Sequence, residues 1–129
     1  MDVSSILRGE DPGKWYPITT NGGPKEPRVR IRVPSPKSLR ELAKIAGVRP
    51  LGGRVGRQEL ENKRLQDEVV DHMILEWTGI YDGESELPCT RENKVGLVDE
   101  WFELYTLVFD VLDMKRTQAV EIEEGGRGN

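Results

Sequence analysis

The sequence predicts a single-domain, mainly α fold of the α+β class: a helical bundle of about four helices with a short β element near the N-terminus. Three observations predict it. The chain has 129 residues, of which 36% are apolar, enough for one modest core. Apolar residues recur at helical spacing in several stretches after residue 35. Residues 28–33 instead alternate with the period of a strand.

Glycine and proline punctuate the first 27 residues, a composition that excludes a helix or a central strand there. We therefore expect residues 1–27 to form a Pro/Gly-rich N-terminal arm. Residues 28–122 are expected to form the helical globular domain, and residues 123–129 a flexible C-terminal tail. One small apolar cluster in the arm is expected to dock on the body: Trp15, Tyr16 and Ile18.

The strand predicted at residues 28–33 alternates strictly between basic and β-branched apolar side chains. The apolar side chains are expected on its buried face, and they are Val29, Ile31 and Val33. The exposed face is expected to carry Arg28, Arg30 and Arg32. Pro34 ends the strand. Ser35 then fits the N-cap of a helix that Gly47 closes, with Pro36 at the first helical position, where its missing N–H costs nothing.

A longer helix is expected from Gln58 to about Gly79, because apolar residues recur there at steps of three to five. They form one broad face: Leu65, Val69, Val70, Met73, Ile74 and Trp77. The Asp-Gly pair at residues 82–83 then predicts a tight turn or a small hairpin. Thr90 is expected to cap a short helix over residues 91–98.

The last helix is the most apolar part of the chain, and Asp99 is expected to cap it. Its apolar residues exceed one core-facing stripe, so some must be exposed or used in self-association. Alternatively, this helix is the central one of the bundle and is covered on most sides. The candidate protein-binding residues on it are Trp101, Phe102, Tyr105 and Phe109.

The charge balance argues against several classes of partner. A net charge of −4 is unlike a general nucleic-acid binder, and it disfavours adsorption on anionic membranes. No run approaches the roughly 20 apolar residues of a membrane helix, and the N-terminus has no pattern of a signal peptide. Cys89 is the only cysteine, so no internal disulfide can form, which suits a reducing compartment.

Two readings of the arginine-bearing strand stay open. Arg28, Arg30 and Arg32 could contact phosphates or an acidic protein surface. Alternatively they are an exposed sheet face, or an edge strand that its charge protects from aggregation.

A search for catalytic, metal or cofactor sites finds no complete set of residues. His72 is the only histidine and has no cysteine or second histidine at ligand spacing, so it cannot build a typical zinc site. Cys89 precedes a helix N-terminus, where a thiol pKa can fall, but no base is near it in sequence. The glycine-rich run at residues 52–57 lacks the ending of a P-loop, and Asp82, Glu84 and Glu86 match only part of a calcium loop. We therefore expect a protein that is not an enzyme and has no cofactor.

Three stretches together resemble the tail assembly chaperones of long-tailed bacteriophages and related prophages. The first is the basic strand that runs into a Pro-Ser-Pro helix, at residues 28–40. The second, at residues 69–83, contains Trp-x-Gly and Asp-Gly elements. The third is Leu-Pro-Cys-Thr-Arg-Glu-Asn at residues 87–93, which opens a helix. The resemblance covers residues 28–112.

This resemblance implies a chaperone in the bacterial host cytoplasm that holds the tape-measure protein while tail-tube subunits polymerise around it. It further implies that the chain is absent from the finished virion. The tail-tube protein and a second copy of the chain are further candidate partners. Two alternatives remain. One is a structural tail or neck component of the virion. The other is a small nucleic-acid-binding regulator that uses six arginines: Arg28, Arg30, Arg32, Arg49, Arg54 and Arg57.

Overall fold

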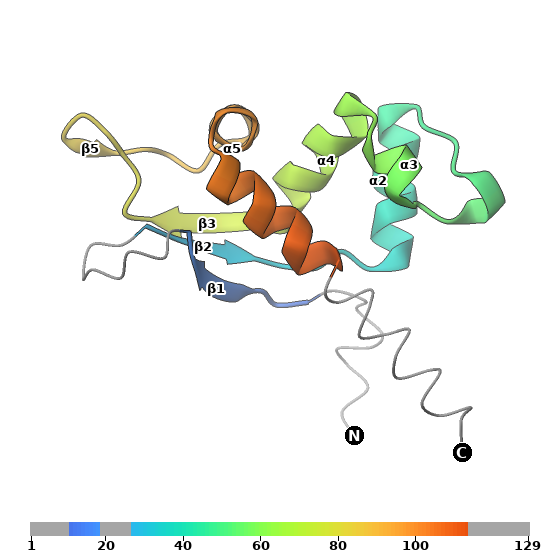
Figure 1. The fold of residues 1–129 in the computed structure, drawn as a ribbon, viewed down its shortest axis with the longest axis horizontal. Helices are drawn as coiled ribbons and strands as arrows, with labels where there is room; N and C mark the ends of the chain where they lie inside the picture. The colour runs from blue at the N-terminus through green and yellow to red at the C-terminus, as the bar shows by residue number, and fades with distance from the viewer. Residues whose placement is uncertain (1–10, 19–26, 114–129) are drawn as a thin grey trace, which may run out of the picture.

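A computed structural model describes residues 11–18 and 27–113 of the chain. The expected C-terminal tail and most of the expected N-terminal arm lie outside these residues. Within them, helices pack beside a three-stranded antiparallel sheet, and a two-stranded sheet forms a separate hairpin (Figure 1). The fold is therefore mixed α+β. The expected helical bundle of about four helices is wrong, because strands supply part of the framework on which the helices pack.

Strand β1 (Lys14–Pro17) pairs with strand β2 (Arg28–Ile31), and it brings part of the expected arm into the sheet. Tyr16 lies opposite Val29, and the N–H of Ile18 donates a 3.0 Å hydrogen bond to the carbonyl of Pro27. Ile18 is buried. The docking expected of the apolar cluster therefore occurs by strand pairing.

Strand β2 has the predicted alternation, since Val29 and Ile31 are buried and Arg28 is exposed. Its other neighbour is strand β3 (Ile74–Thr78), in a stretch that was expected to be helical. Val29 lies opposite Trp77, and Ile31 lies opposite Ile74, with a register shift between the two pairs. The extra residue of this β-bulge lets two residues three apart face the same side of a strand.

The single long helix expected from Gln58 is wrong for this reason. Ile74 and Trp77 are both buried, and their three-residue spacing imitates a helix. The segment also breaks earlier, into helix α3 (Arg57–Leu60) and helix α4 (Lys63–Met73). Asn62 caps α4, because its side-chain oxygen accepts hydrogen bonds from the backbone N–H groups of Arg64 and Leu65.

Helix α2 (Pro36–Ala46) confirms the local prediction at both ends. The hydroxyl of Ser35 accepts a 3.0 Å hydrogen bond from the N–H of Ser38, and Pro36 is the first helical residue. Gly47 ends the helix with φ of 74°, a left-handed conformation that glycine adopts without a Cβ clash. A short 3₁₀ turn (Leu51–Gly53) follows in the glycine-rich loop.

Strands β4 (Tyr81–Asp82) and β5 (Ser85–Glu86) form the predicted hairpin, with Gly83 at positive φ in the turn. Helix α5 (Arg91–Glu100) begins at the predicted N-cap, Thr90. A further helix covers residues 102–113. Asp99 does not cap that helix as expected, because α5 continues through it to Glu100.

The core joins the inner face of the sheet to the helices. Its most deeply buried side chains come from β2, α4, β3 and the helix at residues 102–113: Val29, Ile31, Leu65, Val69, Val70, Met73, Ile74, Leu104, Val108, Val111 and Leu112. Among the residues described, no helix has the length and apolarity needed to cross a membrane.

Candidate protein-binding surface

The helix at residues 102–113 has one buried face and one aromatic face. The buried face consists of Leu104, Val108, Val111 and Leu112, at helical spacing. Beside it lies a stripe of Phe102, Tyr105 and Phe109, which we call the aromatic stripe. The exposed fraction is 75% for Phe102 and 40% for Tyr105, and Phe109 is half-buried. The expected excess of apolar residues is therefore real, and part of it faces outward.

The aromatic stripe is continuous, because steps of three and four residues return to the same side of a helix. The ring centroids of Tyr105 and Phe109 are 4.8 Å apart, with their planes tilted by 43°. Such a tilted pair is a favourable arrangement of two rings. Phe102, at the beginning of the helix, is the most exposed large apolar side chain among the described residues.

Trp101 differs from the three residues of the aromatic stripe. It is half-buried and packs against the core. Its backbone N–H donates a 2.7 Å hydrogen bond to the carbonyl of Leu97. Its backbone carbonyl accepts a hydrogen bond from the backbone N–H of Tyr105. Trp101 therefore forms the joint between α5 and the next helix, and it sets the direction in which the aromatic stripe faces.

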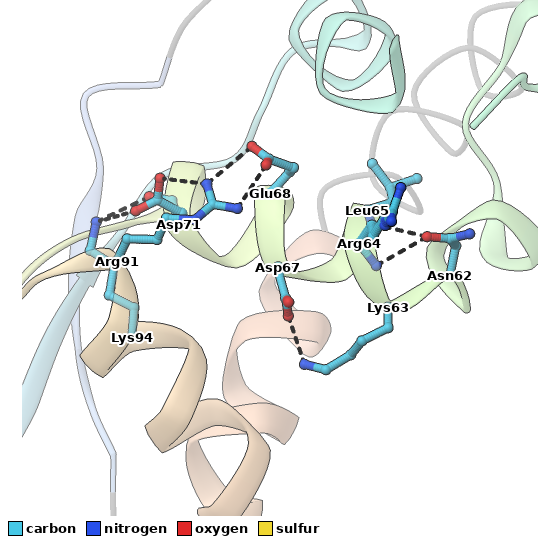
Figure 2. Close-up of polar contacts among 9 residues, drawn as sticks. All are labelled: Asn62, Lys63, Arg64, Leu65, Asp67, Glu68, Asp71, Arg91 and Lys94. Atoms are coloured by element: carbon cyan, nitrogen blue, oxygen red, sulfur yellow. Dashed lines mark hydrogen bonds and ion pairs between the residues drawn. The ribbon is translucent and has the colours of Figure 1, made fainter. Parts of the chain in front are cut away.

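An ion-pair network fixes α5 against α4 and so supports that joint (Figure 2). The Arg91 guanidinium makes two hydrogen bonds to the carboxylate of Glu68, at 2.7 and 3.2 Å. The Lys94 side chain is only 11% exposed, and its Nζ donates to the carbonyl and to Oδ1 of Asp71 at 3.1 and 3.2 Å. A buried ammonium is tolerated when it is paired in this way.

Lys63 adds a second link between α4 and α5. Its Nζ lies 2.6 Å from Oδ1 of Asp67 in its own helix and 2.6 Å from Oδ1 of Asp99 in α5. Burial acts to lower the pKa of Lys63, but hydrogen bonds to Asp67 and Asp99 outweigh it, so this pKa is raised. The sequence alone did not reveal this network, although the acids at residues 67, 68 and 71 lie on the predicted polar face of one helix.

Two of the three arginines of the basic strand make hydrogen bonds to backbone carbonyls. The Arg30 Nη2 donates a 2.6 Å hydrogen bond to the carbonyl of Pro12. The Arg32 Nε donates at 2.8 Å to the carbonyl of His72, in the last turn of α4, where a cation is favoured by the helix dipole. Arg28 is exposed. Two of the three guanidiniums thus serve the fold, which gives little support to a phosphate-binding ladder.

Cys89 and His72 are the two single residues that the sequence analysis weighed for chemistry, and both lie among the described residues. Burial raises the pKa of the Cys89 thiol, with Lys94 opposing and Glu76 and Asp71 adding to the rise, so the thiol is less nucleophilic than a free one at neutral pH. His72 is half-buried beside Arg32. Within residues 11–18 and 27–113, no group of three or more His, Cys, Asp or Glu side chains could hold a metal ion.

No family model, curated protein or solved structure matched the chain.

Proposed function

We propose that this chain is a non-enzymatic tail assembly chaperone of a long-tailed phage or prophage. In this proposal it acts in the bacterial cytoplasm, where it binds the tape-measure protein before and during polymerisation of the tail tube. The aromatic stripe is the observation that carries the proposal. Exposed aromatic side chains beside a buried helix face are a surface on which an apolar helix of a partner can pack.

The geometry of the three resembling stretches supports the proposal. The first and second meet in the sheet, where Val29 lies opposite Trp77. The second and third meet where Nε1 of Trp77 donates a 2.7 Å hydrogen bond to the carbonyl of Leu87. Stretches that are separate in sequence thus converge on one buried tryptophan. This arrangement is expected of motifs that specify a common fold.

The energetics favour an apolar partner. Burying a phenylalanine side chain fully gains about 1.5–3 kcal/mol of free energy. Because Phe102 is 75% exposed, most of that free energy is still available for binding a partner. A tape-measure helix with its own apolar stripe would cover Phe102 and Tyr105 together. The chaperone would thereby shield apolar surface of a long helical protein that has not yet been enclosed by the tube.

Co-expression with the cognate tape-measure protein tests this proposal. We expect the wild-type chain to raise the soluble fraction of that protein and to copurify with it. The variant Phe102→Asp should lose both effects, and Tyr105→Gln should weaken them. Aspartate is a mild change for the fold at Phe102, because an acidic side chain suits the first turn of a helix.

Ile45→Asp is the matched control, because Ile45 is 69% exposed but lies on α2. It should retain both effects. Equal solubility of the tape-measure protein with and without this chain would refute the chaperone. Loss of copurification in Ile45→Asp but not in Phe102→Asp would refute the aromatic stripe as the binding surface. Detection of the chain in purified particles by mass spectrometry would instead favour a structural virion component.

A further inference from the structure

A groove of ≈ 470 Å³ opens beside strand β3, and none of its lining residues belongs to the aromatic stripe. It is lined by three consecutive residues of β3, 76–78, and by residues 86–89. Trp15 of strand β1 also lines it. The groove therefore lies at the end of the sheet from which the β4–β5 hairpin projects (Figure 1).

The position of β3 favours an extended ligand. In the part of the chain that the structure describes, the strand order is β1-β2-β3, so β3 is the outermost strand on its side. An outer strand presents backbone N–H and C=O groups with which an added strand can pair. Because three consecutive residues of this outer strand line the groove, an extended segment fits it better than a helix does.

The side chains of the groove favour a cation. Glu76, with a side-chain exposed fraction of 52%, and Glu86, which is also exposed, both line it. The hairpin adds Asp82 and Glu84, both exposed. Arg30 is the cation that faces Glu76, but its Nη1 is 3.9 Å from Oε2 of Glu76 while its Nη2 is held at 2.6 Å by the carbonyl of Pro12. The Glu76 carboxylate is therefore only partly neutralised by Arg30.

Trp15 supplies a second element of cation recognition. It is 44% exposed, although it is paired opposite Arg30 in the sheet. An indole ring attracts an ammonium or guanidinium group placed over its face. Two carboxylates and an aromatic ring in one groove are complementary to a lysine or arginine side chain.

We propose that this groove binds an extended segment of a partner protein and takes up a lysine or arginine side chain between Glu76, Glu86 and the ring of Trp15. The segment adds to the outer edge of β3, and its basic side chain supplies the specificity. This site is separate from the aromatic stripe, so it stands whether or not the tape-measure protein is the partner of that stripe.

The only cysteine of the chain provides a reporter, because Cys89 lines the same groove. The experiment measures the rate at which iodoacetamide alkylates Cys89 in the full-length protein. The probe is a short, terminally blocked, threonine-rich peptide with one central lysine. A peptide with glutamate in place of the lysine is its counterpart. We expect the lysine peptide to slow alkylation in a saturable way and the glutamate peptide to have no effect.

The double variant Glu76→Gln/Glu86→Gln should weaken binding of the lysine peptide by about tenfold, since two partly exposed ion pairs are lost. Trp15→Leu should weaken it by about threefold. The matched control, Glu41→Gln/Glu61→Gln, removes the same charge from exposed residues of α2 and the end of α3, and it should bind as the wild type does. Each variant is compared with its own rate without peptide, because Glu76 also affects the thiol.

Equal protection by the lysine and glutamate peptides would overturn the proposal. Unchanged affinity in the Glu76→Gln/Glu86→Gln variant would overturn it as well, and so would failure of the lysine peptide to protect Cys89 at millimolar concentration. Weakened binding that also falls with added salt would support it, because exposed ion pairs are screened by salt.

Discussion

The indole Nε1 of Trp77 donates a 2.7 Å hydrogen bond to the carbonyl oxygen of Leu87. The ring of Trp77 is 5% exposed and lies in the core, opposite Val29 of the neighbouring strand. One side chain thus joins the sheet to the segment that leads into α5. This contact adds to the ion pairs that hold α5 against α4.

Trp77→Phe tests the hydrogen bond while it keeps an aromatic ring in the core. We expect a loss of about 1–2 kcal/mol in the free energy of unfolding, because a partly buried carbonyl loses its donor and the core loses volume. Urea denaturation followed by circular dichroism measures the change. Trp15→Phe is the control, and it should change the stability by less than about 0.5 kcal/mol because Trp15 is partly exposed. An equal loss in both variants would contradict the role of Trp77.

Two glycines should respond in opposite directions to alanine. Gly47→Ala should destabilise the protein by about 1–2 kcal/mol, because Gly47 has φ of 74° and a Cβ there is strained. Gly96→Ala should stabilise it by about 0.5–1 kcal/mol, because Gly96 lies inside α5, where alanine is the better helix former. A Cβ at either position meets nothing within 4 Å, so packing does not confuse the comparison. Thermal unfolding of both variants decides the signs.

The thiol of Cys89 should titrate above the ordinary range for cysteine. Burial raises its pKa, which means that the folded state favours the protonated thiol. The resulting stabilisation is complete below the unfolded-state pKa of about 8.5, and it is lost as the pH rises through the higher folded-state pKa. The pH profile of iodoacetamide alkylation should therefore have a higher midpoint in folded protein than in urea.

Substitution at Glu76 refines that prediction. Glu76→Gln should lower the midpoint of the profile, because the Glu76 carboxylate helps to raise this pKa. Glu41→Gln, an exposed change on α2, should leave it where it was. The same midpoint in the folded and unfolded wild type would show that Cys89 is more solvated than the structure indicates.

Phe102 and Leu104 should differ sharply in their effect on stability, although they are two residues apart on one helix. Leu104 has 0% exposure, and Leu104→Ala should cost about 2–5 kcal/mol. Phe102 is 75% exposed, and Phe102→Ala should change stability by less than about 0.5 kcal/mol. Urea denaturation midpoints provide the measurement. A large loss in Phe102→Ala would mean that the aromatic stripe belongs to the core and is unavailable to a partner.

Local chemistry determined several elements from the sequence alone. The ends of α2 follow from Ser35, Pro36 and Gly47, and the start of α5 follows from Thr90, because caps act over only a few residues. The buried face of β2 follows from its alternation. The excess of apolar residues in the last helix was also evident, and Phe102 is its clearest exposed member.

Tertiary structure decided the rest, because strand pairing and bulges depend on residues that are far apart in the sequence. Ile74 and Trp77 have helical spacing, and only the register with β2 makes them a bulged strand. The same pairing makes β3 an outer strand and brings Trp15 and Glu86 to one groove. Lys94 is buried because Asp71, on another helix, satisfies its charge. Each outcome depends on contacts between distant parts of the chain, whereas periodicity describes only one segment at a time.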